Sequence, residues 1–262
     1  IRALSIREKA LGPRHLDVAR TLSVLGFVYW IQGRYPAAEQ ADRRALAIYE
    51  KEFGPEHSDV ATTVLSLAIV HRDQQRYQEA EPLYKRALAI RERLFGAESA
   101  TFAEALKALG ELYRRGERYD EAEPVLARAL AIDEKVLGAT HPYVATDCTS
   151  LGHLYRDQRR YSEAEPYFKR ALAIFQGGSS QVQPDFVATA LSNLASIYFL
   201  LGRSSEAEPL YKSAMALEEK LLGSENPRIA QTLVNLAVLY REQARYSEAE
   251  PLYMRALQIT ER

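Results

Sequence analysis

The sequence of 262 residues contains a single cysteine, Cys148. One cysteine cannot form an internal disulfide, and its isolation argues against a cysteine-based zinc site. A protein without disulfides suits a reducing compartment, so we expect a cytoplasmic location. We expect Cys148 itself to be a small buried residue of its helix, and the alternative is a reactive thiol.

The sequence also lacks an excess of charge of either sign and any long apolar run. Its 34 basic and 35 acidic residues leave a net charge of −1, which gives no general attraction to nucleic acid or to an anionic membrane. The longest apolar run, 24–31 with its glycine, is far shorter than the roughly 20 residues of a membrane-spanning helix. We therefore expect neither nucleic acid nor a membrane as a partner. Because the chain begins with Ile1 rather than Met, we expect it to be a fragment of a longer protein.

What the sequence does contain is one motif repeated six times. The stretch RYSEAEP occurs at 160–166 and again at 245–251, and related stretches begin at residues 34, 76, 118 and 203. Successive copies lie 42 residues apart, except for one interval of 43. The additional residue falls in the Gly/Ser-rich connection FQGGSSQVQPDF at 175–186, which we expect to be the least regular junction. A fixed period of this length indicates stacked structural repeats.

Each repeat predicts two helices, one before the motif and one after it. In the segment 229–243, four residues follow the i, i+3, i+4, i+7 spacing of one helix face: Leu233, Leu236, Ala237 and Tyr240. Segments after the motif show the same spacing and end at a glycine such as Gly96, which we expect to close the helix in a left-handed conformation.

The motif itself predicts the turn between the two helices and the start of the second. We expect the serine of SEAE, such as Ser162, to be the N-cap residue, with Glu165 completing a capping box. Pro166 would then lie in the first turn, where a proline removes at most one main-chain hydrogen bond. Asp120 and Ser205 predict the same arrangement in their repeats.

Two repeats illustrate a large–x2–large–small–x2–aromatic pattern, followed by Ala–x3–aromatic, or Ala–x3–Leu in the repeat of Leu126, with a further Ala. One repeat shows all of these positions: Leu191, Leu194, Ala195, Tyr198, Ala207, Tyr211 and Ala214. The small position is Gly or Ala in all six repeats, at 26, 68, 110, 152, 195 and 237, and we expect the paired helix to approach closely there. This pattern resembles the tetratricopeptide repeat. The period of 42 and endings such as ALSIREKALG at 3–12 resemble the kinesin light chain class of these repeats.

We therefore predict an all-α fold, an α-solenoid of antiparallel helix pairs that form a right-handed superhelix over residues 1–262. Residues 1–11 match the second helix of a repeat. Six helix pairs follow, at 15–53, 57–95, 99–137, 141–176, 183–222 and 225–262. The first helix of each pair is expected to line the concave side.

The sequence does not predict an enzyme. His15, His57 and His141 recur in the loops between repeats, too far apart to share a metal ion, and we expect them to structure those loops. We find no nucleophile with a base partner, no phosphate-binding loop and no metal-ligand spacing. We expect no catalytic residue, no metal and no cofactor.

The candidate binding residues form a stripe along the first helices. The last position of the stripe is arginine in four repeats: Arg72, Arg114, Arg156 and Arg241. Forked guanidinium donors at this spacing suit carboxylates on an extended peptide. The alternative is a structural role, because Asp73, Asp157 and Glu242 directly follow three of these arginines and can neutralise them.

The other candidate residues of the stripe are aromatic or polar: Phe27, Trp30, Lys107, His153 and Phe199. Trp30, with Phe27 and Ile31, either packs against the preceding truncated repeat or forms a hot-spot pocket for a partner. The resemblance adds Asn193 and Asn235, because repeats of the kinesin light chain type often carry asparagine just before the leucine of the first helix. It also implies binding of short cargo peptides that have an aromatic residue among acidic ones.

Together these features predict a non-catalytic scaffold that binds an extended acidic and aromatic peptide segment in its concave groove. Two alternatives stay open. The chain could be a structural module that self-associates end to end, or a sensor domain of a larger multidomain protein.

Overall fold

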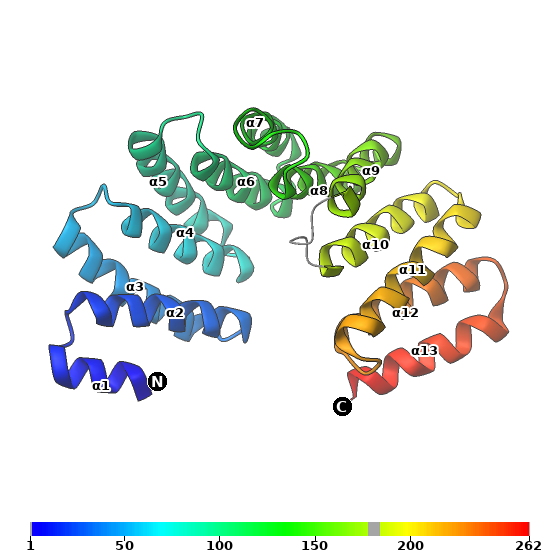
Figure 1. Ribbon diagram of the computed structural model, residues 1–262, viewed down its shortest axis with the longest axis horizontal. Helices are drawn as coiled ribbons and strands as arrows, with labels where there is room; N and C mark the ends of the chain where they lie inside the picture. Colours follow the sequence, from blue (N-terminus) through cyan, green and yellow to red (C-terminus); the bar gives the residue numbers. More distant parts are fainter. Residues whose placement is uncertain (1, 178–183, 262) are drawn as a thin grey trace. The chain divides into compact units, whose positions relative to one another are not determined.

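The computed structural model describes residues 2–177 and 184–261, and all regular structure in these residues is α-helical (Figure 1). The thirteen helices are α1 (Arg2–Leu11), α2 (Leu16–Ile31), α3 (Tyr35–Phe53), α4 (Ser58–Asp73), α5 (Tyr77–Phe95), α6 (Ala100–Arg115), α7 (Tyr119–Leu137), α8 (Pro142–Asp157), α9 (Tyr161–Gly177), α10 (Pro184–Leu200), α11 (Ser204–Leu222), α12 (Pro227–Glu242) and α13 (Tyr246–Thr260).

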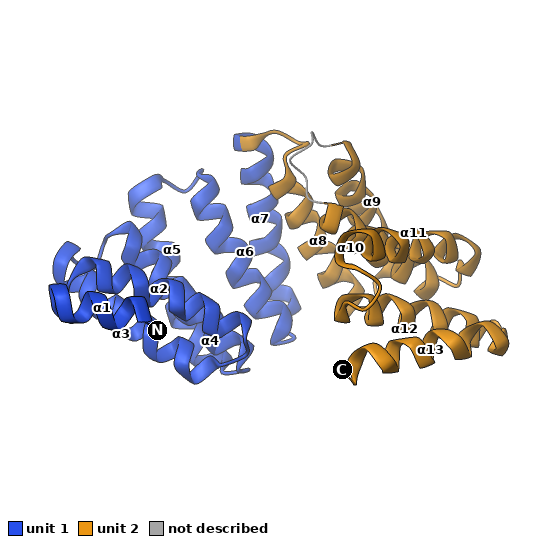
Figure 2. Cartoon of the chain, turned by 60° about the horizontal axis from the view of Figure 1, so that its bottom comes forward, with its two compact units in different colours: residues 1–136 blue, residues 137–262 orange. Residues whose placement is uncertain are grey.

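Neighbouring helices pack as antiparallel pairs, for example α2 with α3 and α12 with α13. The prediction of an all-α chain of sequential helix pairs is therefore confirmed. The chain divides into two compact units, residues 1–136 and residues 137–262 (Figure 2). The stretch 178–183 of the predicted irregular junction, the first residue of the predicted pair 183–222, and residues 1 and 262 lie outside the described residues.

The small residue of each first helix lies where its partner helix approaches closely. A Cβ atom added to Gly110 would come within 2.5 Å of Cδ2 of Leu126, and one added to Gly152 within 2.8 Å of Cζ of Phe168. Where the residue is alanine, as at Ala68 and Ala195, it is fully buried. The prediction of close helix packing at these positions is confirmed.

The second helix of each pair begins earlier than the sequence predicted. In α13 the N-cap residue is Arg245, whose side chain makes no capping hydrogen bond, and the helix starts at Tyr246. The expected N-caps at Asp120, Ser162 and Ser205 are therefore wrong, since each lies inside its helix. The first turn is stabilised instead by an ion pair, as when Nε of Arg245 donates to Oε1 of Glu248 at 2.7 Å. An acidic residue in the first turn also interacts favourably with the helix dipole.

This earlier start moves the proline out of the first turn. Pro82 is the sixth residue of α5, and Pro166 and Pro251 occupy the same position in α9 and α13. The prediction that Pro166 lies in the first turn is therefore wrong. A proline at this point has no N–H for the carbonyl four residues earlier, which belongs to the first turn. The lost hydrogen bond therefore lies near the N-terminal end of the helix rather than in its middle.

The glycines that end the second helices have the expected positive φ but an extended ψ. Gly54 has φ 82° and ψ 170°, and its N–H donates to the carbonyl oxygen of Glu50 at 3.0 Å. This region is essentially restricted to glycine, unlike the left-handed helical region that we expected. A side chain at this position would strain the backbone.

The repeated histidines begin the first helices. His15, His57 and His141 are N-cap residues of α2, α4 and α8, and Nδ1 of each accepts the backbone N–H two residues later at 3.1–3.2 Å. Their predicted loop-structuring role is confirmed. Cys148 is completely buried, as expected.

Candidate functional site

In the first unit, hydrogen bonds and charge connect the predicted stripe across α2, α4 and α6. Nε1 of Trp30 donates to Oδ2 of Asp73 at 2.7 Å, and Nε of Arg72 donates to Oδ1 of Asp73 at 2.9 Å. On α6, Nε and Nη2 of Arg114 donate to Oε2 of Glu111 at 3.0 and 2.9 Å. Glu111 also lies close enough to Arg72 to favour its charged form. The structure therefore brings together Trp30, Arg72 and Arg114.

Asp73 is the centre of this network. Burial acts to raise its pKa, but the hydrogen bonds from Arg72 and Trp30 outweigh burial, so the pKa of Asp73 lies below its ordinary value. Nη1 of Arg115 adds a weaker contact at 3.4 Å. Asp73 is thus a charged carboxylate held by donors from three helices.

Every arginine of the stripe is paired with a carboxylate of its own helix. Arg156 pairs with Asp157 at 2.9 Å and Arg241 pairs with Glu242 at 2.8 Å. The side chains of Arg72 and Arg114 are only 12% and 14% exposed, whereas those of Arg156 and Arg241 are 32% and 53% exposed. A ligand carboxylate would therefore share these guanidinium groups with an internal carboxylate or replace it, most easily at Arg156 and Arg241.

In the second unit the remaining candidates lie on three first helices: His153 on α8, Asn193 and Phe199 on α10, and Asn235 on α12. The ring of His153 meets the ring of Phe168 edge-on at 5.2 Å, so it packs against α9. Asn235 accepts a hydrogen bond from Nε2 of Gln231 at 3.0 Å. Asn193, Phe199 and, in the first unit, Lys107 are half-buried.

Phe27 and Trp30 form an aromatic pair on α2. Their ring centroids lie 5.8 Å apart, and Phe27 is 59% exposed. The neighbouring Val24 and Ile31 are both 63% exposed, so the helices of this unit leave this face of α2 uncovered. Trp30 is half-buried and contacts α4 through its hydrogen bond to Asp73.

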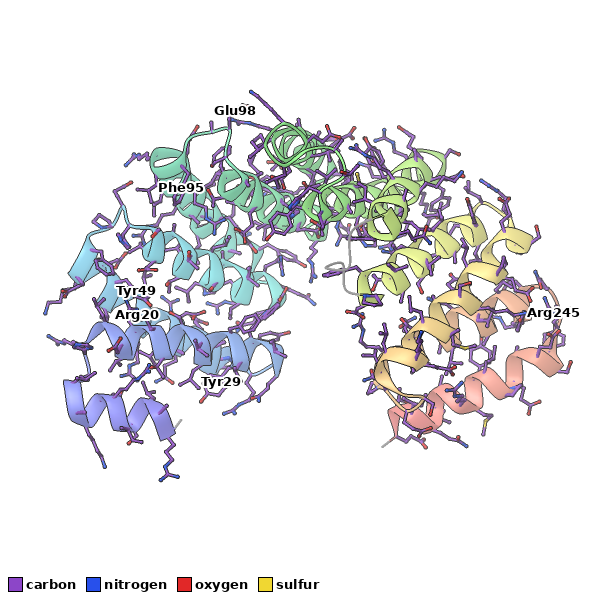
Figure 3. All side chains as sticks on the ribbon, viewed as in Figure 1. Arg20, Tyr29, Tyr49, Phe95, Glu98 and Arg245 are labelled. Atoms are coloured by element: carbon purple, nitrogen blue, oxygen red, sulfur yellow. The ribbon has the colours of Figure 1, made fainter. Side chains whose placement is uncertain are left out.

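Sequence reasoning missed the role of the arginine that opens each motif. Arg118 donates through Nη1 to Glu81 of the preceding repeat at 2.6 Å and through Nε to Glu121 of its own helix at 2.6 Å. Its guanidinium also lies over the ring of Tyr113, 4.4 Å from the centroid. Arg203 and Arg245 repeat this arrangement, with Arg245 at the turn between α12 and α13 (Figure 3). The signal in the sequence was the recurrence of Arg and Glu one repeat apart.

A second missed residue is Asp42. It takes the position that other repeats fill with an aromatic residue or leucine: Tyr84, Leu126, Phe168, Tyr211 and Tyr253. Asp42 is nevertheless only 2% exposed. An acidic residue at an aromatic position is visible in the sequence and was the available signal.

The part of the chain that the structure describes contains neither a metal-ligand cluster nor a membrane-spanning helix. Within residues 2–177 and 184–261, no three His, Cys, Asp or Glu side chains are grouped to hold a metal ion. None of the helices there combines the length and apolar character needed to cross a bilayer.

The fold and the repeat geometry define a protein built of helix-pair repeats, and the family comparison names the class. The chain belongs to the tetratricopeptide repeat family, whose sequence model matches residues 1–51, 25–93, 59–135, 101–177 and 186–262. A second tetratricopeptide repeat description matches residues 149–217. No curated protein sequence matches the chain.

Solved structures show the same fold at low sequence identity. BtubC (BKLC) from P. vanneervenii is 23% identical, with a TM-score of 0.69 over 87% of this chain and 89% of that one. Kinesin light chain-like repeats from Podospora anserina, described as nearly identical TPR-like repeats, are 24% identical, with a TM-score of 0.65 over 78% and 97% of the two chains. A Rap protein complexed with competence and sporulation factor is 17% identical, with a TM-score of 0.65 over 97% and 82%. Kinesin light chain-like proteins are therefore among the structural neighbours of this chain.

Proposed function

We propose that this chain is a non-catalytic scaffold that binds an extended segment of a partner protein along the first helices of its repeats. Tetratricopeptide repeats typically serve protein–protein interaction. A neighbour with the same fold is complexed with a factor. The partner segment is acidic and contains an aromatic residue, because the stripe carries guanidinium groups together with the exposed ring of Phe27 and the half-buried ring of Trp30.

The observation that carries the proposal is the connected row of Trp30, Asp73, Arg72, Glu111 and Arg114 on three successive first helices. Asp73 and Glu111 occupy the positions that ligand carboxylates would take, and they hold the guanidinium forks in fixed orientations. Exchange of one carboxylate for another gives only a modest net energy at each arginine, less than about 1 kcal/mol. Affinity therefore comes mainly from burial of an aromatic side chain against Phe27 and Trp30.

The second unit offers more accessible groups for the same purpose. Arg156 and Arg241 are the more exposed arginines, and Asn193 and Asn235 carry amides that can bind a peptide backbone. His153 adds a polar contact and Phe199 an aromatic one, and Lys107 adds a polar contact in the first unit. Each unit can thus carry a binding surface of its own.

The test uses a fluorescein-labelled peptide with one tryptophan among aspartates and glutamates, followed by anisotropy. We predict that the double variant Arg114→Gln/Arg156→Gln weakens binding at least about tenfold, which corresponds to ~1.4 kcal/mol. Glu111→Gln removes the internal competitor of Arg114 and is expected to tighten binding.

Arg43→Gln is the matched control, because Arg43 forms an ion pair with Glu39 on a second helix, α3, away from the stripe. It is expected to leave the affinity unchanged. Unchanged affinity in both the double variant and Glu111→Gln, with normal thermal melts, would show that the arginines are structural.

A further inference from the structure

The side chain of Asp42 lies beneath α2, in the position where other repeats place a ring or a leucine. Tyr84, Leu126 and Phe168 fill that position completely and are at most 1% exposed. The carboxyl group of Asp42 instead lies directly against Gly26, where an added Cβ atom would collide with Oδ1. The shorter side chain leaves the space of the missing ring unfilled.

That space is a cavity of about 190 Å³ between α2, α3 and α4. Phe27 and Trp30 of α2, Ser66 and Ile69 of α4, and Asp42 of α3 line it. The volume is several times the roughly 30 Å³ that one water molecule takes up in the liquid. A short alkyl chain with a charged head fits such a space.

The charge of Asp42 is not compensated within the protein. Among the described residues it has no hydrogen-bond or ion-pair partner, and burial alone raises the pKa of its carboxyl group to about 7. Asp73, by contrast, receives hydrogen bonds from Trp30 and Arg72. A buried carboxylate without a donor is unfavourable unless a cation or a donor reaches it.

The walls of the cavity suit a cation that carries an alkyl chain. Aromatic faces attract ammonium groups, most strongly at tryptophan, and the Phe27–Trp30 pair forms one wall. Ile69 offers apolar contact to methylene groups, and the hydroxyl of Ser66 can accept a hydrogen bond from an ammonium.

We propose that the cavity between α2, α3 and α4 is a binding site for an alkylammonium group, with Asp42 as its counter-ion and Trp30 and Phe27 as its aromatic wall. Both a lysine side chain of a partner protein and a free aliphatic amine have this chemistry. The inference shares Phe27 and Trp30 with the proposed peptide-binding surface, but it requires neither the arginines of the stripe nor an acidic peptide.

Trp30 is the only tryptophan in the chain, so its fluorescence reports directly on the cavity. The full chain is titrated at pH 8 and constant ionic strength with n-butylammonium and with n-butanol, which has the same alkyl chain without the charge. We expect a saturable change with n-butylammonium and binding at least about tenfold weaker with n-butanol. A third ligand, Nα-acetyl-lysine amide, carries the ammonium on a peptide frame. Saturation by it as well assigns the site to a protein side chain, and saturation by n-butylammonium alone assigns it to a free amine.

Two variants separate binding from folding. Asp42→Asn keeps the shape and removes the charge, and Asp42→Leu fills the cavity with the residue that the third repeat carries at Leu126. Both are expected to fold, as judged by circular dichroism, and to lose the saturable response. The proposal is overturned if either variant binds n-butylammonium like the unaltered chain, or if n-butanol binds equally well.

Discussion

At the scale of single residues, Asp42 and Asp73 show how the same type of side chain acquires opposite properties in two places within one unit. Both are withdrawn from solvent, but Asp73 receives hydrogen bonds from Trp30 and Arg72 and its pKa is lowered. Asp42 has burial as the sole cause of its shift, and its pKa is raised to about 7. The presence or absence of hydrogen-bond donors, rather than burial alone, decides whether the pKa of a buried aspartate is lowered or raised.

This difference predicts a pH dependence of stability that belongs to Asp42. The pKa is 3.8 in an unperturbed aspartate and about 7 here, so between these values the folded chain holds a proton that the unfolded chain has lost. Its contribution to stability therefore falls as pH rises through this window, and above about pH 7 the folded state is less stable than below pH 3.8 by on the order of 4 kcal/mol.

Asp42→Asn removes this titration. We expect the variant to be more stable than the unaltered chain at pH 8, with a smaller difference at pH 5, as measured by urea unfolding followed by Trp30 fluorescence. Because the two proteins share all their other carboxylates, the difference between their free energies of unfolding at each pH reports on Asp42 alone. Parallel pH profiles would contradict the assignment of a raised pKa to this residue.

At the scale of helices, the sequence predicted where the helices lie, but not which contacts stabilise the first turn of the second helix in each pair. The 42-residue period and the i, i+3, i+4, i+7 spacing are local patterns, and they located the helix pairs and the buried small residues. The capping-box pattern at Ser162 was misleading, because the helix already begins at Tyr161 and Arg160 pairs with Glu163 in its first turn. Partners 37 residues apart, such as Arg118 and Glu81, leave no trace in a local pattern. For the same reason, the arginines of the stripe could be located from the sequence, but their burial could not.

The arginine that opens the last motif allows a prediction at this scale. Glu208 has its pKa lowered to about 2, first by its hydrogen bond from Arg245, with further hydrogen bonds from Lys212 and Tyr240 opposing the effect of burial. A lowered pKa means that this stabilisation is present above pH 4.5 and is lost as pH falls toward 2. Arg245→Gln should therefore lower the free energy of unfolding of α11–α13 at pH 7 and lower it much less near pH 2.

Arg20→Gln provides the matched control for this variant. Arg20 is 65% exposed and forms an i, i+3 pair with Asp17, so its removal should change the free energy of unfolding by less than about 0.5 kcal/mol. Denaturant unfolding at pH 7 and pH 2 compares the two variants. An equally large effect of Arg245→Gln at both pH values would mean that its ring contact with Tyr240, rather than the ion pair, carries the stabilisation.

At the scale of the whole molecule, each repeat is stabilised by its neighbours, because contacts join helices of the same or adjacent repeats. Stability in such an array is approximately a sum of local terms. The chain also separates into two compact units, 1–136 and 137–262. A change within one repeat should therefore affect its neighbours and fade within a short distance along the chain.

Hydrogen exchange measured by mass spectrometry on Arg245→Gln and Asp42→Leu tests whether each change affects only its own and neighbouring repeats. Arg245→Gln is expected to speed exchange in α11–α13 and to leave α2–α5 unchanged, because Arg245 contacts Glu208 and Glu248 only in the second unit. Asp42→Leu fills the cavity in the first unit, so it should slow exchange in α2–α5 without altering α11–α13. The two variants thus control for each other within one protein. If either change altered exchange equally in both units, folding would be cooperative across all repeats, and the local terms would not account for stability.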